Sequence, residues 1–249
     1  MARPLLIGAG AGLVSAALFA SAATATPLAG LLFYLAPLPI SLAGLGWGWM
    51  AGVAASLAGT LVAGAVLGVS TGLVYALAVG VPLAVLCYLA LLSRPVTQAA
   101  AAPAAQDFEW YPVGRLVGGA ALIAGILAML MVLALGYDTQ SYSQSIKSVL
   151  EHSAIKELDQ NGSIINDNTI ANLSTVLARA LPAAFAIVWL SIALFNVWLG
   201  GVIVEASGRA LRPWPQIDAL ELPNAVFFAF TASLIGSFLP GLVGLIATA

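Results

Sequence analysis

The chain has 249 residues, of which 61% are hydrophobic and only 7% are charged. A soluble domain carries about 25% charged residues, so this composition excludes a water-soluble globular protein. The eight Lys and Arg residues are scattered, which excludes a nucleic-acid-binding patch, and the single Cys87 and single His152 exclude disulfides and Cys- or His-rich metal clusters. We therefore expect an all-α, polytopic transmembrane helix bundle of about seven spans in contact with the lipid bilayer.

Residues 1–93 form an N-terminal half that carries no charged side chain between Pro4 and Ser93. A span needs about 20 apolar residues, so this run fits four helices joined by short turns. The predicted spans are 5–23, 28–46, 49–68 and 73–93, with breaks at 24–27, 44–48 and 70–72. The pattern at 20–22 also resembles a signal-peptide cleavage site, but we expect the first helix to remain uncut.

The first span has a small residue at every fourth position, at Gly8, Gly12, Ala16 and Ala20. Residues spaced by four share one helix face, and small side chains there let two membrane helices approach closely. Packing within the bundle explains such a face. Docking of a helix from another subunit is the alternative, and both interpretations stay open.

The second span contains two prolines, Pro37 and Pro39. Each removes a backbone donor and breaks the helical ladder. In a membrane, the freed carbonyls must be satisfied by protein or line a cavity, and discontinuous spans are typical of transporter binding sites. The sequence therefore predicts either a simple kink or a ligand site here.

Asn196 is a polar residue inside the sixth predicted span. An unsatisfied amide in hydrocarbon costs several kcal/mol, so Asn196 must face the bundle, where it binds either another helix or a ligand. Aromatic residues on the second and sixth spans extend the possible site. The candidate ligand-binding residues are Tyr34, Pro37, Trp47, Asn196 and Trp198.

The rest of the chain alternates apolar and polar segments. Residues 94–116 are a cytoplasmic linker, 117–136 hold the fifth span, 137–180 form an external polar loop, and 181–249 hold two spans at 183–204 and 225–247. An apolar stripe from Tyr142 to Leu158 predicts an amphipathic helix, and Asp167 or Asn168 starts a helix that runs into the sixth span. Glu205 and Arg209 are spaced for an i,i+4 ion pair.

The distribution of basic residues predicts the orientation, because short cytoplasmic loops are rich in Lys and Arg. With the N-terminus in the cytoplasm of a multi-pass inner (plasma) membrane protein, five Arg residues lie inside. They are Arg3, Arg94, Arg115, Arg209 and Arg212.

No catalytic or nucleotide-binding motif is present in the sequence. The first five spans also lack a titratable carboxylate or base in their apolar cores. These features argue against an enzyme, against a bound cofactor, and against a pump driven by its own proton or sodium site.

The order of several features resembles the YybS-like family of uncharacterised bacterial membrane proteins. The residues that carry this resemblance are 36–39 (Ala-Pro-Leu-Pro), 44–48 (Gly-Leu-Gly-Trp-Gly), the polar loop before the sixth span, Asn196, and 222–223 (Leu-Pro). Members of that family usually have one further span, which this chain would then lack. The family is distantly similar to the substrate-binding S components of energy-coupling-factor transporters, from which this chain departs in span number and external loop.

Two functions are consistent with these features. The resemblance implies an S-component-like transport subunit without its own ATPase, whose partners are a coupling protein and ATPases and whose docking face is Gly8, Gly12, Ala16 and Ala20. The alternative is a structural or assembly protein of the cell envelope that binds other membrane proteins through its small-residue helix faces.

Overall fold

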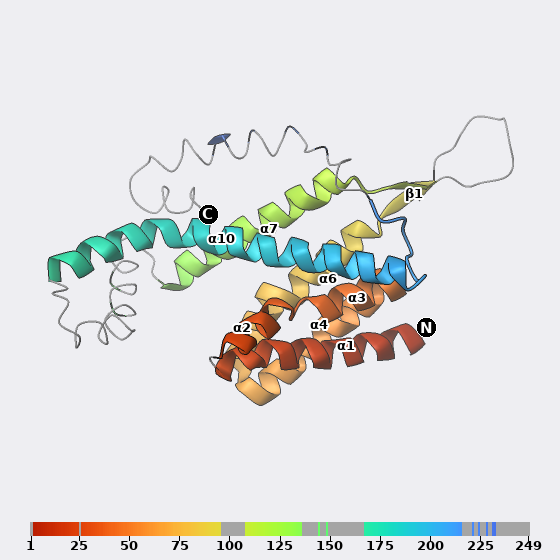
Figure 1. The fold of residues 1–249 in the computed structure, drawn as a ribbon, viewed down its shortest axis with the longest axis horizontal. Helices are drawn as coiled ribbons and strands as arrows, with labels where there is room; N and C mark the ends of the chain where they lie inside the picture. Colours follow the sequence, from red (N-terminus) through yellow and green to blue (C-terminus); the bar gives the residue numbers. More distant parts are fainter. Residues whose placement is uncertain are drawn as a thin grey trace, which may run out of the picture. The chain divides into compact units, whose positions relative to one another are not determined.

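The computed structural model describes residues 2–24, 26–95, 108–135 and 167–215, and the single positions 144, 148, 221, 224, 228, 231 and 232. Almost all of these residues are helical (Figure 1). The elements are α1 (Ala2–Ala20), η1 (Ser21–Thr24), α2 (Pro27–Tyr34), α3 (Leu38–Trp47), α4 (Trp49–Leu67), α5 (Val69–Tyr75), η2 (Ala76–Gly80), α6 (Val81–Ala90), β1 (Ser93–Pro95), β2 (Phe108–Trp110), α7 (Val113–Leu135) and α10 (Asp167–Ala206).

Six helical stretches are long and apolar enough to cross a bilayer. They are Ala2–Thr24, Pro27–Trp47, Trp49–Leu67, Val69–Ala90, Val113–Ala134 and Ala180–Ala206. They confirm the all-α fold class and six of the seven predicted spans. Most of the predicted seventh span at 225–247 and most of the external loop with its amphipathic helix lie outside the described residues, as do linker residues 96–107 and the pair 222–223.

The chain divides into two compact units, which we describe separately. The first comprises Met1–Ala120 and Ser191–Pro223, and it contains every candidate site residue named above. The second comprises Ala121–Leu190 and Asn224–Ala249. Its described part consists of the later turns of α7 and the earlier turns of α10, and α10 begins at Asp167, as the sequence predicted.

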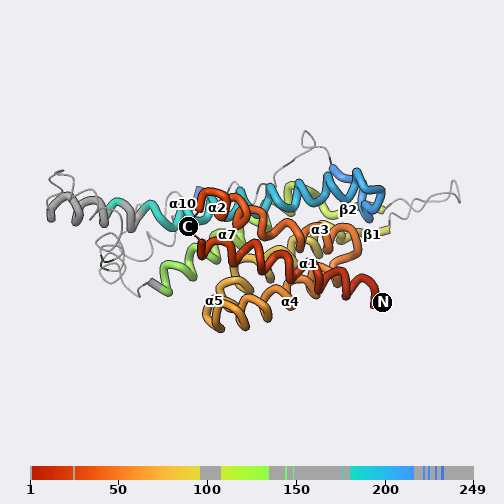
Figure 2. The backbone as a smooth tube through the Cα atoms, turned by 60° about the horizontal axis from the view of Figure 1, so that its bottom comes forward, coloured from red at the N-terminus to blue at the C-terminus, as the bar shows by residue number. Residues whose placement is uncertain are grey.

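Helix α1 packs directly on α4, although two helices separate them in sequence (Figure 2). A Cβ atom at Gly8 would overlap the carbonyl oxygen of Ala51, and one at Gly12 would overlap that of Ala55. The two backbones therefore touch where the sequence provides no side chain. Gly8, Gly12 and Ala16 are buried within their own chain and Ala20 is half-buried, which favours packing within the bundle over docking of another subunit on this face.

Single glycines join α3 to α4 and α4 to α5. Gly48 and Gly68 both have φ of 98°, a conformation that side-chain-bearing residues rarely adopt. The predicted break at 70–72 is therefore wrong. The turn is at Gly68, and residues 70–72 belong to the first turns of α5, where Thr71 Oγ1 donates to the carbonyl of Leu67 at 3.2 Å.

Helix α4 also contacts the fourth span through small residues. Gly64 and Gly72 meet closely, since a Cβ at Gly72 would lie 2.6 Å from the Cα of Gly64. Ser56 Oγ donates to the carbonyl of Gly80 at 2.7 Å, at the end of the π-helical segment η2. Small residues of α4 thus let it pack closely against the fourth span.

The strands β1 and β2 form a short antiparallel pair in the segment predicted to be an irregular linker. Arg94 and Glu109 lie opposite each other and form an ion pair with an N–O distance of 2.7 Å. Both side chains are largely exposed, so the pair contributes little to stability.

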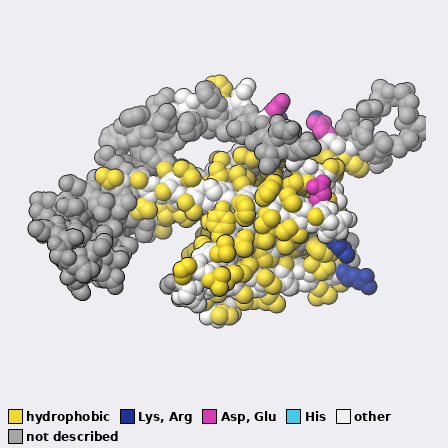
Figure 3. All heavy atoms as spheres, viewed as in Figure 1, with side chains coloured by type: hydrophobic (Ala, Val, Ile, Leu, Met, Phe, Trp, Pro, Cys, Tyr) yellow, Lys and Arg dark blue, Asp and Glu magenta, His cyan; other side chains and the backbone are white. Residues whose placement is uncertain are grey.

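The visible surface of the first four spans is mainly hydrophobic, with charged side chains gathered toward one end (Figure 3). Large apolar side chains on it are well exposed, among them Leu6 at 71%, Leu61 at 71% and Val66 at 72%. A soluble protein rarely exposes so large an apolar patch. This surface fits contact with lipid.

Candidate functional site

The predicted break in the second span is present, between the end of α2 at Tyr34 and the start of α3 at Leu38. Polar side chains from other helices bond to the carbonyls around it. Asn196 Nδ2 donates to the carbonyl of Tyr34 at 2.8 Å, and Ser15 Oγ donates to that of Ala36 at 2.6 Å. The bundle itself thus supplies donors to two carbonyls at the break.

A buried tyrosine extends this network. The hydroxyl of Tyr75 donates to Ser15 Oγ at 2.7 Å, so a chain of hydrogen bonds runs from α5 through α1 to Ala36. Tyr75 is fully buried, and its hydroxyl lies against Gly59, where a Cβ atom would overlap it. The residue is therefore part of the core, rather than the wall of an open pocket.

Replacing Tyr75 by phenylalanine is expected to lower the free energy of unfolding by about 1 kcal/mol, because one buried hydrogen bond between membrane helices is lost. Thermal unfolding of the purified protein in detergent measures the effect. Tyr88 is a suitable control, since it is 44% exposed and stacks edge-on with Trp49. An equal or larger loss for Tyr88→Phe would contradict the role given to Tyr75.

The predicted ligand-binding residues do not form one cluster. Asn196 is fully buried, Pro37 is buried, and the ring of Tyr34 packs on Phe195 with centroids 5.6 Å apart. Asn196 also donates to the carbonyl of Ile192 at 2.8 Å. Around these residues the geometry favours an interhelical tie over a ligand contact.

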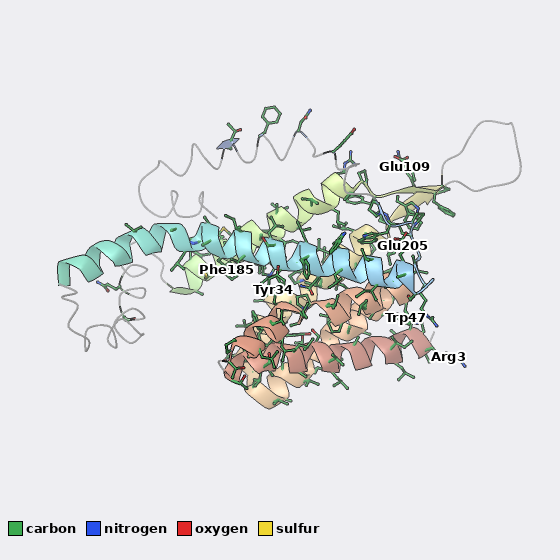
Figure 4. The ribbon with its side chains drawn as sticks, viewed as in Figure 1. Arg3, Tyr34, Trp47, Glu109, Phe185 and Glu205 are labelled. Atoms are coloured by element: carbon green, nitrogen blue, oxygen red, sulfur yellow. The ribbon has the colours of Figure 1, made fainter. Side chains whose placement is uncertain are left out.

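Trp47 belongs to a different contact, well apart from Tyr34 along the second span (Figure 4). The guanidinium of Arg209 lies 5.1 Å from its ring centre. The predicted ion pair between Glu205 and Arg209 is wrong, because α10 ends at Ala206 and Glu205 Oε1 instead accepts the backbone N–H of Trp214 at 3.3 Å. The turn after α10 removes the i,i+4 geometry that the pair required.

Trp198 lines a cavity of about 360 Å³ within the first unit. The cavity lies among the first turns of α7, the later part of α10 and the segment that follows α10. Its lining residues are Val113, Leu116, Val117, Leu194, Phe195, Val197, Trp198, Arg212, Trp214 and Pro215. The wall is almost entirely apolar, and Arg212 is the one charged residue among the described residues that line it, so the cavity suits an amphipathic ligand.

Arg212 is buried, with only 8% of its surface exposed. Its Nη1 donates to the carbonyl of Ala90 at 2.9 Å, and its guanidinium lies 5.9 Å from the ring centre of Trp110. Burial lowers the pKa of the guanidinium, but arginine stays charged at neutral pH. Arg212 Nε and Trp214 Nε1 are both buried and have no hydrogen-bond partner among the described residues.

A family model for predicted membrane proteins, DUF2232, matches residues 13–249. The chain belongs to the DUF2232 family. No curated protein and no solved structure matches it significantly. Family membership and the six apolar helices together identify an integral, multi-pass membrane protein.

The sequence alone does not identify Arg212 and Trp214 as residues of the cavity in this DUF2232 protein. In the sequence, Arg212 serves only as an orientation signal, and Trp214 is not among the candidate residues. A signal is nevertheless present, because an arginine and a tryptophan alternate with Pro213 and Pro215 directly after a span. Prolines restrict the backbone, and such a short, stiff segment can hold two side chains in place.

Two neighbouring glycines of α10 in the DUF2232 protein allow close packing, and Gly201 leaves room for the ring of Trp214. A Cβ atom at Gly201 would overlap the indole ring, so the ring lies directly on the backbone of α10. On α3, Ser41 approaches Gly200, where a Cβ atom would lie 2.9 Å from the Cβ of Ser41.

Within the described part of the chain, no group of three or more His, Cys, Asp or Glu could hold a metal ion.

Proposed function

We propose that this integral membrane protein is a substrate-binding subunit of a transporter, similar in role to an S component, and that other subunits supply its energy. The observation that carries the proposal is the cavity beside Trp198, an apolar space of about 360 Å³ whose lining includes Arg212 and Trp214, two residues with a buried nitrogen donor each that has no partner among the described residues. Binding pockets for small molecules have this character and begin at about 300 Å³.

The absence of titratable groups in the first four spans supports a passive role. Residues 4–93 contain no Asp, Glu, Lys, Arg or His. Ion-driven transporters place such residues within their spans to couple transport to an ion gradient. A subunit without them needs an external energy source, and we propose a coupling protein with ATPases.

We no longer propose the small-residue face of the first helix as the contact with a coupling subunit. Gly8 and Gly12 touch α4, so a coupling subunit that docked on them would have to displace this helix. The assembly hypothesis, which relied on small-residue helix faces, loses the support of this one face for the same reason. We therefore place the partner contact on a different surface and keep the inner-membrane, N-terminus-inside orientation as part of the proposal.

Affinity purification of the full chain from its own membranes tests the proposal. We expect an ATP-hydrolysing subunit and a second membrane protein to co-purify in fixed proportion, with ATPase activity in the complex. A matched purification of an unrelated membrane protein from the same cells serves as the control. Recovery of the chain without any ATPase, also after chemical cross-linking in intact membranes, would count against a transport role.

A further inference from the structure

We propose that the cavity beside Trp198 binds an anionic phospholipid, with the phosphate at Arg212 and Trp214 and an acyl chain along α7 and α10. The inference rests on the proposed function in one respect, because it names the ligand class of the same cavity. The charge, the donors and the walls of that cavity each support it.

The charge of the cavity comes from Arg212. No described carboxylate forms an ion pair with this guanidinium. Glu205 is bonded to the backbone of Trp214, and Glu109 is paired with Arg94. Taking a cation out of water without a counter-charge is costly. An anion in the cavity would offset that cost, so the site is complementary to a negatively charged group.

The unpartnered N–H groups of Arg212 and Trp214 indicate that the anion bound in the cavity is an oxyanion. Arg212 and Trp214 line the cavity, and the Nε atom of Arg212 and the Nε1 atom of Trp214 are buried with no acceptor among the described residues. Two N–H groups from different side chains suit an acceptor with several oxygen atoms, and an arginine fork fits phosphate or carboxylate best. The shared chemistry is therefore an oxyanion that accepts at least two hydrogen bonds.

The apolar walls of the cavity require a ligand with an apolar tail. Val117, Phe195 and Trp198 form part of the cavity wall, and the two aromatic residues remain 38% and 40% exposed. A free phosphate ion would leave these walls unfilled. An amphiphile would fill them with its chain while its head group reaches Arg212.

The position of the cavity near the ends of two spans indicates that its amphipathic ligand is a membrane lipid. The cavity lies at the first turns of α7, which starts at Val113, and at the segment after α10, which ends at Ala206. Ends of spans are the depth at which lipid head groups lie, and basic pockets between membrane helices bind anionic head groups. A phospholipid is already present at this depth with its acyl chains pointing into the bilayer.

Fluorescence quenching in detergent tests the inference, because Trp198 and Trp214 line the cavity. The purified full chain is titrated with phosphatidylglycerol that carries brominated acyl chains, and separately with phosphatidylcholine that carries the same chains. We expect saturable quenching by phosphatidylglycerol at roughly tenfold lower concentration. Arg212→Gln removes a charged hydrogen-bond donor and is expected to weaken phosphatidylglycerol binding about tenfold to a hundredfold.

Arg209→Gln is the matched control. Arg209 lies in the same segment but stacks on Trp47 and does not line the cavity, so its variant should bind phosphatidylglycerol as the wild type does. If Arg212→Gln fails to fold, Trp214→Phe removes only the indole donor and leaves Trp198 as the reporter. It should weaken binding about threefold to tenfold. Native mass spectrometry of retained lipid gives a second readout.

Several results would overturn the inference. Equal quenching by the two lipids, or equal affinities of the Arg212 and Arg209 variants, would show that Arg212 does not recognise the charge of the lipid head group. Displacement of the lipid by millimolar inorganic phosphate would assign the site to a free anion, and tighter binding of oleate would assign it to a fatty acid. Loss of lipid selectivity would leave ATPase co-purification unaffected, so failure of this inference and failure of the transport proposal are distinguishable.

Discussion

Replacement of Gly12 by leucine is expected to give little or no folded protein. The new side chain would start inside the carbonyl of Ala55 and within 2.8 Å of the backbone nitrogen of Gly59. Overpacking usually costs about 1–3 kcal/mol, and here the obstacle is backbone, which cannot rotate away. We expect a loss of about 3 kcal/mol or more, measured as thermal stability and as the yield of monodisperse protein in size-exclusion chromatography.

The same helix provides the control for this experiment. Gly10 lies between Gly8 and Gly12 and is exposed, and no other atom lies within 4 Å of the place that a Cβ atom would take there. Gly10→Leu adds the same side chain on the lipid-facing side, so we expect stability close to that of the wild type. Wild-type stability of Gly12→Leu would mean that α1 does not pack on α4.

Replacement of Asn196 by leucine is expected to destabilise the protein by about 1–3 kcal/mol, the usual cost of leaving a buried hydrogen-bonding group unsatisfied. Leucine has a similar size but cannot donate to the carbonyls of Tyr34 and Ile192. The carbonyl of Tyr34 would then lack the donor that replaces the broken helical ladder. Denaturant titration in detergent, followed by circular dichroism, measures the loss.

Tyr34→Phe separates the backbone of Tyr34 from its side chain. The variant keeps the carbonyl that Asn196 binds and removes only the phenolic hydroxyl, so we expect a small change in stability. If Tyr34→Phe were as damaging as Asn196→Leu, the hydrogen bond to the carbonyl would not be the reason for the effect. If neither variant changed stability, the tie between α10 and the break would be unimportant.

The features that sequence predicts well are those that depend on neighbouring residues. Long apolar runs fix where helices cross a membrane, which is why six spans agree with the structure within a few residues. Pro37 and Pro39 likewise fix the break in the second span, because the missing donors are a local property. The spacing of Gly8 and Gly12 identifies a packing face, but a repeat on one helix carries no information about the helix opposite it.

The features that sequence misses depend on contacts between distant segments. Trp198 is singled out from the sequence, but the cavity that it lines is also lined by Arg212 and Trp214, which follow a turn after α10. That turn also separates Glu205 from Arg209, so a spacing rule for continuous helices fails there. The fourth span starts at Val69 rather than at the predicted residue 73, because Gly68 adopts a positive φ, and sequence spacing does not reveal which of several glycines does so.

The packing of α1 on α4 has a consequence for biosynthesis. The residues that Gly12 touches are synthesised roughly 40 positions later in the chain, which at about 5–20 residues per second is a delay of roughly 2–8 s. During this time α1 has left the ribosome while its bare glycine face has no partner of its own chain. The insertion machinery or surrounding lipid must shelter that face until α4 emerges, so the first helix completes its folding only after the third span has entered the membrane.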